Sequence, residues 1–119
     1  MDVIEVPGRD IGASGVGAPA LIGASERTGG QPFHAINPAT GEKGDVAFSS
    51  AMPADVEQAT KLADEAFESF STLSPDARAT FLESVADNIM GIGDLLIETA
   101  MAESGLPRAR LEGERGRTV

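Results

Sequence analysis

The sequence predicts a short β hairpin or meander over residues 20–50, followed by about four α-helices over residues 53–119. Nine of the 14 glycines lie in the first 50 residues, where Gly and Pro clusters separate short strand-like runs. After Met52 the chain is rich in Ala, Leu, Asp and Glu, and apolar residues recur at helical spacing. The change in composition therefore divides the chain into a strand-forming and a helix-forming part.

The strand-forming part begins after residues 1–19, which are expected to be a mobile segment because Gly and Pro dominate there. Strands are expected at residues 20–24, 31–36 and 44–49, with turns at residues 27–30 and 37–41. Small hairpins are seldom stable alone in water, so this part needs a surface on which to pack.

The helix-forming part carries clear start and stop signals. Pro53 suits the first position of a helix, and Ser74 followed by Pro75 predicts a capped second start. A third helix is expected over residues 94–104, because Gly105 fits the left-handed position after a helix end. Pro107 then opens a fourth. The first helix has an apolar stripe, formed by Val56, Ala59, Ala63, Ala66, Phe67 and Phe70, and Glu57 is expected to pair with Lys61 one turn later.

The last 17 residues, ESGLPRARLEGERGRTV, hold four of the nine basic residues. Arg108 with Glu112, and Arg110 with Glu114, have the spacing of intrahelical ion pairs. Arg117 is the least well paired, because Glu114 is shared with Arg110 and no acid follows it. No capping residue follows either, so the helix is expected to continue past Val119.

Bulk charge and composition exclude several functions. The net charge of −10 argues against a nucleic-acid binder, since phosphate affinity comes from Lys and Arg. The chain contains no Cys, which excludes thiolate chemistry of its own. The sequence has no membrane-length apolar run, and its acidic opening differs from that of a secretory or transit peptide, so we expect no membrane association and a cytoplasmic location.

The glycine pattern at residues 15–20 and the single histidine could each indicate a binding or catalytic site, but a structural role is favoured for both. Residues 15–20 match the dinucleotide pattern GxGxxA, but Pro19 and the absence of an expected helix after it favour a simple loop. His34 is the only histidine, so it has no partners for a catalytic triad or a multi-histidine metal site. It is expected to be a half-buried strand residue.

Four segments together carry a family resemblance: HAINPATGE (34–42), ADVEQATKLADEAF (54–67), LSPDARATFLESVADNI (73–89) and ESGLPRARLEGERGRT (103–118). Their order and spacing resemble the N-terminal part of the aldehyde dehydrogenase superfamily, and the last segment looks most like the branch that acts on 2-oxoglutarate semialdehyde. The resemblance implies an α/β fold in which residues 20–119 form the N-terminal part of a cofactor-binding domain, truncated at its C-terminal end.

The resemblance also implies an activity, NADP- or NAD-dependent oxidation of a small aldehyde to a carboxylate by a complete, homo-oligomeric enzyme. The nucleophilic Cys, the general base and the cofactor site of the family lie beyond the matched region. The isolated chain is therefore expected to bind no cofactor and to be inactive, with the rest of the fold as its partner. A free-standing acidic helical module that binds another protein is the alternative.

Two sites follow from the resemblance alone. A monovalent cation would be held by the backbone carbonyls of Ala35 and Ile36 and by the side chain of Glu103; the alternative is a capped helix end with an exposed Glu. Arg117 would border the substrate channel and face a substrate carboxylate; the alternative is a solvated helix face.

Overall fold

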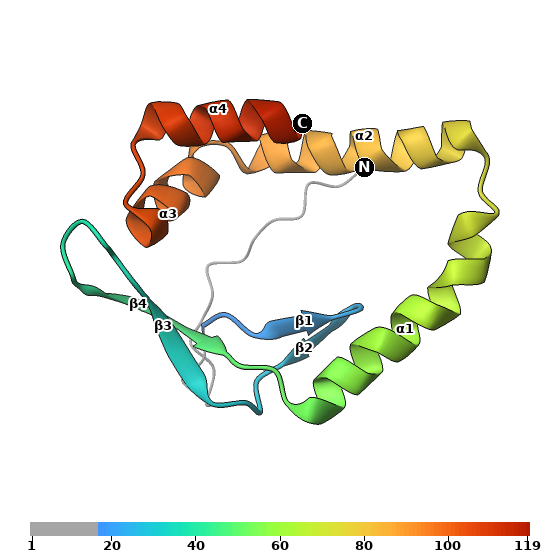
Figure 1. Cartoon of the computed structure of the whole chain (residues 1–119), viewed down its shortest axis with the longest axis horizontal. Coiled ribbons are helices and arrows are strands. Elements are labelled where there is room, and N and C mark those ends of the chain that lie inside the picture. Colours follow the sequence, from blue (N-terminus) through green and yellow to red (C-terminus); the bar gives the residue numbers. More distant parts are fainter. Residues whose placement is uncertain (1–16) are drawn as a thin grey trace. The chain divides into compact units, whose positions relative to one another are not determined.

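The computed structural model describes residues 17–119 (Figure 1). In this part of the chain, four strands precede four helices: β1 (Ala20–Ile22), β2 (Ser25–Arg27), β3 (Pro32–Ile36), β4 (Lys43–Ser49), α1 (Pro53–Ser71), α2 (Pro75–Ile92), α3 (Asp94–Ser104) and α4 (Arg108–Thr118). The predicted succession of short strands and four helices is confirmed. The mobile segment predicted for residues 1–19 lies, up to residue 16, outside the described residues.

The described residues form two compact units. The first, here the α1 unit, comprises residues 17–35 and Gly44–Thr72 and holds β1, β2, α1 and most of β3 and β4. The second, here the corner unit, comprises Ile36–Lys43 and Leu73–Val119 and holds α2, α3 and α4 together with the turn between β3 and β4.

Two separate two-stranded sheets replace the predicted three-stranded meander. β1 pairs antiparallel with β2, so that Leu21 lies opposite Glu26, and β3 pairs with β4. The first reversal occurs at Gly23, which has a φ of 59°, and not at residues 27–30. β2 was missed because its sequence, SER, is polar and fully exposed and so lacks the apolar alternation that indicates a strand.

The buried part of the α1 unit is small. Ala18, Ala47 and Ser49 are its buried residues, and the N–H groups of Gly17 and Ala18 both donate to the Ala47 carbonyl at 3.0 Å. The ring of Phe48 stacks on Phe33 with centroids 5.5 Å apart. Alanines bury little area per residue, so this core contributes little hydrophobic stabilisation.

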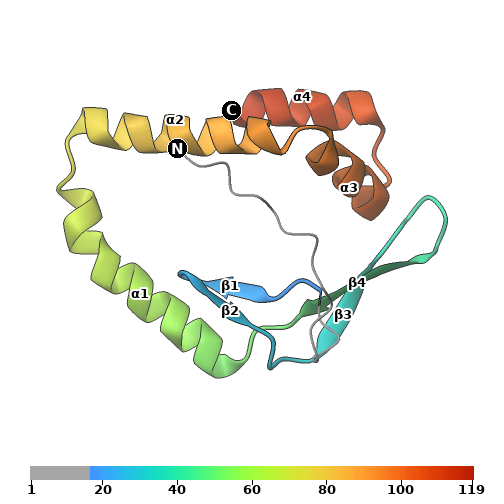
Figure 2. The same cartoon turned by 180° about the vertical axis from the view of Figure 1, so that it is seen from behind.

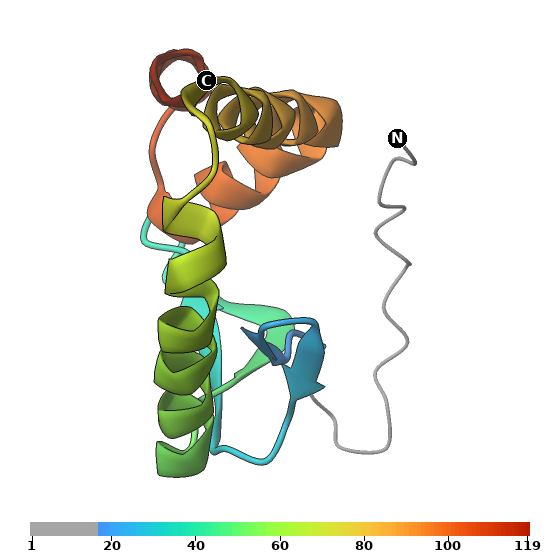
Figure 3. The same cartoon turned by 90° about the vertical axis from the view of Figure 1, so that its right-hand side faces the viewer.

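α1 lies beside the β1–β2 hairpin (Figure 3). Its first turn is fixed by Asp55, whose carboxylate accepts a 2.8 Å hydrogen bond from the Met52 N–H and lies 3.8 Å from the Arg27 Nε. Leu62 packs where a Cβ on Gly23 would approach its Cδ1 to 2.9 Å. Even so, none of the residues of α1 is buried.

The corner unit contains α2, α3 and α4, which follow one another along the chain (Figure 2), and glycines join them at positions 93 and 105. Ser74 caps α2 by accepting from the Ala77 N–H at 3.1 Å, as predicted, and Gly93 joins α2 to α3 with a φ of 68°. Gly105 ends α3 in the left-handed conformation, at a φ of 69°, which confirms that prediction. Pro107 caps α4 instead of being its first residue. Ile97 on α3 is 2% exposed.

Candidate functional site

One face of α4 holds the helix against α3 through two arginines. Arg108 donates from Nη1 to Asp94 at 3.2 Å and from Nη2 to Glu98 at 3.4 Å, and both acids are on α3. Seven residues later, Arg115 donates to the Gly93 carbonyl at 3.1 Å. A spacing of seven is about two helical turns, so both arginines point to the same side of α4. Helix α4 is thus fastened at both ends.

Arg108 also pairs with Glu112 on its own helix, at 3.4 Å, as the sequence predicted. The hydrogen bonds that Arg108 donates to Glu112 and to Asp94, together with the charges of both acids, raise the pKa of Arg108 above its ordinary value, although partial burial opposes the change. Arg108 therefore stays charged at any physiological pH, and it balances one of the three carboxylate charges around it.

The opposite face of α4 carries Arg110, Glu114 and Arg117. The Oε1 atom of Glu114 accepts from Arg110 Nε at 2.9 Å and lies 2.8 Å from Arg110 Nη2. The Oε2 atom lies 3.4 Å from Arg117 Nη2. The shared use of Glu114 is as predicted, and Arg117 obtains its partner through the second oxygen. Its side chain remains 84% exposed.

A groove of about 510 Å³ lies at the joint of α3 and α4. It is lined by Asn37, Ala39, Glu98, Met101, Ala102, Gly105, Leu106, Pro107 and Arg108. The turn at Asn37 is held by its side-chain oxygen, which accepts from the Ala39 N–H at 2.9 Å. Gly105 permits the close approach of this turn, since a Cβ there would lie 2.8 Å from Pro38 Cγ.

The three residues predicted to bind a cation belong to two different units. Ile36 and Glu103 belong to the corner unit and both are exposed, whereas the half-buried Ala35 belongs to the α1 unit. Among residues 17–119, no group of three or more His, Asp or Glu side chains could hold a metal ion. The predicted set would depend on two backbone carbonyls instead, and it stays a prediction.

His34 and the described part of the glycine pattern both lie in or next to β-strands. His34 is a half-buried residue of β3, as predicted, and its Nδ1 donates to the Gly44 carbonyl at 2.9 Å in the tautomer with the proton on Nδ1. Residues 15 and 16 of the glycine pattern lie outside the described part. The pattern ends in strand β1, so no helix N-terminus follows to receive a phosphate.

Sequence reasoning missed the α3 partners of Arg108. Asp94 and Glu98 are four residues apart and so share a helix face, which is a detectable signal. The sequence does not tell which basic side chain pairs with these two acids, because that contact depends on how Gly105 turns the chain between α3 and α4. The contact of Arg115 with a backbone carbonyl has no sequence signal.

The sequence model of the aldehyde dehydrogenase family matches residues 25–119. The chain belongs to the aldehyde dehydrogenase family. It is 50% identical over 101 residues to alpha-ketoglutaric semialdehyde dehydrogenase 2 of Azospirillum brasilense, covering 83% of this chain and 19% of that protein. It is 40% identical over 72 residues to alpha-ketoglutaric semialdehyde dehydrogenase of Acinetobacter baylyi, covering 60% of this chain and 14% of that protein.

No solved structure matches the chain. The chain spans less than a fifth of the length of these two curated members of the aldehyde dehydrogenase family. The match of the family model over residues 25–119 confirms the resemblance to the aldehyde dehydrogenase family. Both glycine joints and the whole of α4 lie inside the matched residues.

Proposed function

We propose that this chain is the N-terminal segment of a cytoplasmic NADP- or NAD-dependent aldehyde dehydrogenase that oxidises 2-oxoglutarate semialdehyde to 2-oxoglutarate. The observation that carries the proposal is the 50% identity over 101 residues to the Azospirillum brasilense protein, whose name states that substrate. Family membership supports aldehyde oxidation, and this identity supports the choice of aldehyde.

The chain supplies structure and not the chemical step. Oxidation by this family's thiolate route needs a Cys nucleophile, and the sequence contains none. The described residues also expose many large apolar side chains, including Phe67 at 71% and Leu82 at 63%, while only Ala18, Ala47 and Ile97 are buried apolar residues. Exposed apolar surface of this kind marks an interaction site. The rest of the fold is the partner we propose for it, within a homo-oligomeric enzyme.

The nicotinamide dinucleotide would be bound by that remainder. A dinucleotide site needs a helix N-terminus directly after its glycine loop, and here the described part of the loop leads into β1.

Within the complete enzyme, Arg117 is the residue we assign to the substrate channel. Its side chain is 84% exposed and has one ion pair on α4, so its guanidinium can donate to a carboxylate in the bidentate geometry that Arg favours. The carbonyls of Ala35 and Ile36 with Glu103 form the proposed monovalent-cation site, since hard cations prefer oxygen ligands.

Two measurements test the function. The purified 119-residue chain is expected to show no aldehyde-dependent reduction of NADP or NAD, and turnover by the pure chain would contradict a silent segment. In the second measurement, residues of this chain replace the 101 aligned residues of the Azospirillum brasilense enzyme. This chimera is expected to oxidise 2-oxoglutarate semialdehyde. A folded, soluble chimera without activity would contradict the proposal.

A free-standing acidic module is the second candidate, because the net charge of −10 and the exposed apolar faces also fit a binding protein. The two candidates differ in how the chain unfolds. A segment with so small a core is expected to melt broadly or to self-associate, whereas an independent module melts sharply as a monomer at every concentration. Downstream coding sequence with a Cys-containing catalytic domain would favour the segment.

A further inference from the structure

Glu114 is arranged differently from the other acid on α4. Both Glu112 and Glu114 follow an arginine by four residues, so the local sequence treats them alike. Glu112 joins an arginine that also binds α3, and it belongs to the contact between the two helices. Glu114 forms its ion pairs with Arg110 and Arg117, which are both on α4 itself. Its ion pairs therefore do not fasten α4 to α3.

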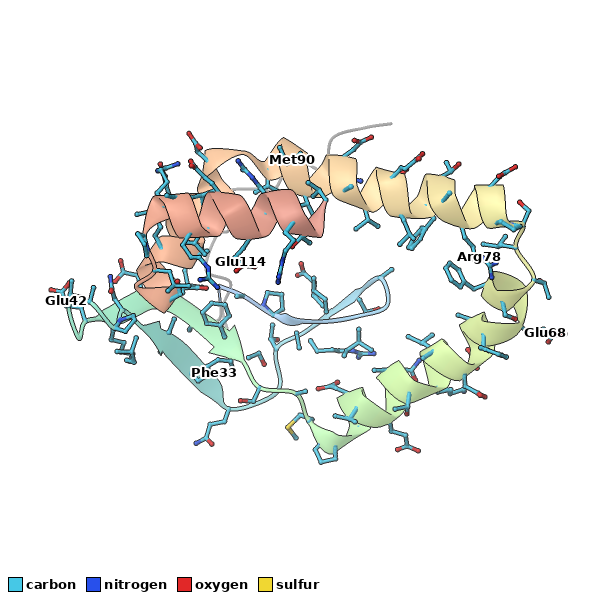
Figure 4. The ribbon with its side chains drawn as sticks, turned by 45° about the horizontal axis from the view of Figure 1, so that its top comes forward. Phe33, Glu42, Glu68, Arg78, Met90 and Glu114 are labelled. Atoms are coloured by element: carbon cyan, nitrogen blue, oxygen red, sulfur yellow. The ribbon has the colours of Figure 1, made fainter. Side chains whose placement is uncertain are left out.

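The two oxygens of Glu114 are divided between its two partners. Two nitrogens of Arg110 lie 2.9 and 2.8 Å from Oε1, while Arg117 Nη2 lies 3.4 Å from Oε2. Glu114 is labelled in Figure 4 on the α4 ribbon. Its side chain is 39% exposed, compared with 84% for that of Arg117. The ion pair thus joins a largely exposed base to a less exposed acid.

Arg117 keeps most of its binding capacity in this arrangement. A guanidinium has five N–H donors in a planar fork, and the side chain of Arg117 is 84% exposed beside its pair with Glu114. The trio of Arg110, Glu114 and Arg117 has a net charge of +1, from two bases and one acid, in a chain whose net charge is −10. It is therefore a local cationic surface on an acidic protein, suited to a small carboxylate.

We propose that Glu114 is a positioning residue for substrate selection: it holds Arg117 along α4 so that the unused edge of the guanidinium receives the carboxylate of the aldehyde substrate. The inference rests on the proposed function and adds the means of specificity. A long Arg side chain loses rotamer freedom when it binds, and an ion pair that orders it beforehand reduces that loss. Aldehydes without a carboxylate gain nothing from the arrangement.

The test uses the chimera described above and two aldehydes, 2-oxoglutarate semialdehyde and uncharged butanal. Glu114→Gln keeps one oxygen, which still accepts hydrogen bonds, and replaces the other oxygen with an NH₂ group, which can only donate. The KM for the charged aldehyde is expected to rise about two- to five-fold, the range of an exposed ion pair. Arg117→Ala is expected to raise it about ten-fold or more, as for a lost hydrogen bond to a charged group. Both variants should raise the KM for the charged aldehyde by a larger factor than the KM for butanal.

Glu112→Gln is the matched control, because it makes the same chemical change on the same helix next to an arginine that faces α3. It is expected to leave the ratio of the two KM values unchanged. The double variant Glu114→Gln/Arg117→Ala separates positioning from general structure. If Glu114 acts through Arg117, the double variant matches Arg117→Ala alone.

Several outcomes would overturn the proposal. A fall in KM for the charged aldehyde in Glu114→Gln would mean that Glu114 competes with the substrate for Arg117. Equal changes for both aldehydes, or an added loss in the double variant, would mean that its role is structural. These results require an active chimera. A chimera that oxidises neither aldehyde contradicts the proposed function instead, so the two failures are distinguishable.

Discussion

Helix α1 and the corner formed by α3 and α4 show two ways of placing helices in a protein of low aromatic content. α1 spans 19 residues and has none buried. α3 and α4 have 11 residues each, yet α3 contains Ile97, the most buried side chain of the described residues, and α4 is fastened by Arg108 and Arg115. The shorter helices are the better fixed.

The difference follows from where each helix keeps its apolar residues. On α1 they lie mainly on a stripe that the α1 unit leaves exposed, with Val56 at 55% and Phe67 at 71%. On α4 there is little apolar surface, and polar contacts across a glycine joint replace it. A long amphipathic helix depends on a partner for its stability, whereas the corner carries its own contacts.

The largest expected effect is at the centre of the corner. Ile97→Ala removes a side chain that is 2% exposed and is expected to cost about 2–4 kcal/mol, through lost burial and the cavity left behind. Amide hydrogen exchange in α3 and α4 would report the loss of protection. Leu95→Ala on the same helix is the control, because Leu95 is 58% exposed and its loss should change protection little. Equal effects of the two substitutions would contradict an Ile97-centred corner.

Substitutions at two glycines should act in opposite directions. Gly105→Ala requires a left-handed backbone, at a φ of 69°, which costs about 1–2 kcal/mol. Its Cβ would also lie 2.8 Å from Pro38. Gly113→Ala lies inside α4 with no atom within 4 Å of the new Cβ, and it should stabilise the helix by about 0.5–1 kcal/mol. Hydrogen exchange in α4 should fall for the second variant and rise for the first. If Gly113→Ala also destabilised α4, the new methyl group would have to clash with a neighbouring atom, which contradicts the open space at Gly113.

The helices were predictable because their boundaries depend on local chemistry. Ser74 caps α2, Gly105 ends α3 and the bounds 94–104 agree with the structure, since capping and the left-handed glycine act within a few residues. Ion pairing was less predictable. Lys61 was expected to pair with Glu57, one turn before it, but its Nζ lies 3.8 Å from the carboxylate of Glu65, one turn after it. Both acids have the right spacing, and rotamers decide between them.

The strands and the site depended on contacts that local sequence does not encode. The polar strand β2 forms because the turn at Gly23 brings it opposite β1. The corner was missed because Asp94 and Glu98 meet Arg108 only after Gly105 redirects the chain. Arg117 and its shared partner Glu114 were foreseen, since both lie on one helix at regular spacing.

A smaller effect is expected from the ion pairs of Arg108. Arg108→Gln removes the charge that faces Asp94, Glu98 and Glu112. Protection of α4 should fall modestly at low salt, and the difference from the parent chain should shrink as salt screens the pairs. The comparison is hydrogen exchange at low and high sodium chloride. A salt-independent loss would indicate that Arg108 packs through its alkyl stem instead.

The smallest expected effect is on α1, and its value lies in the contrast between two settings. Phe67→Ser changes a side chain that is 71% exposed, so in the 119-residue chain it should alter stability by no more than about 0.5 kcal/mol and reduce self-association. In the chimera the same stripe is expected to be covered, and the substitution should lower the melting temperature clearly. Glu68→Ser, one residue along and off the stripe, should be neutral in both settings. If Phe67→Ser is equally harmless in the chimera, the exposed stripe of α1 does not bind the rest of an aldehyde dehydrogenase, and a separate partner becomes the better account of that face.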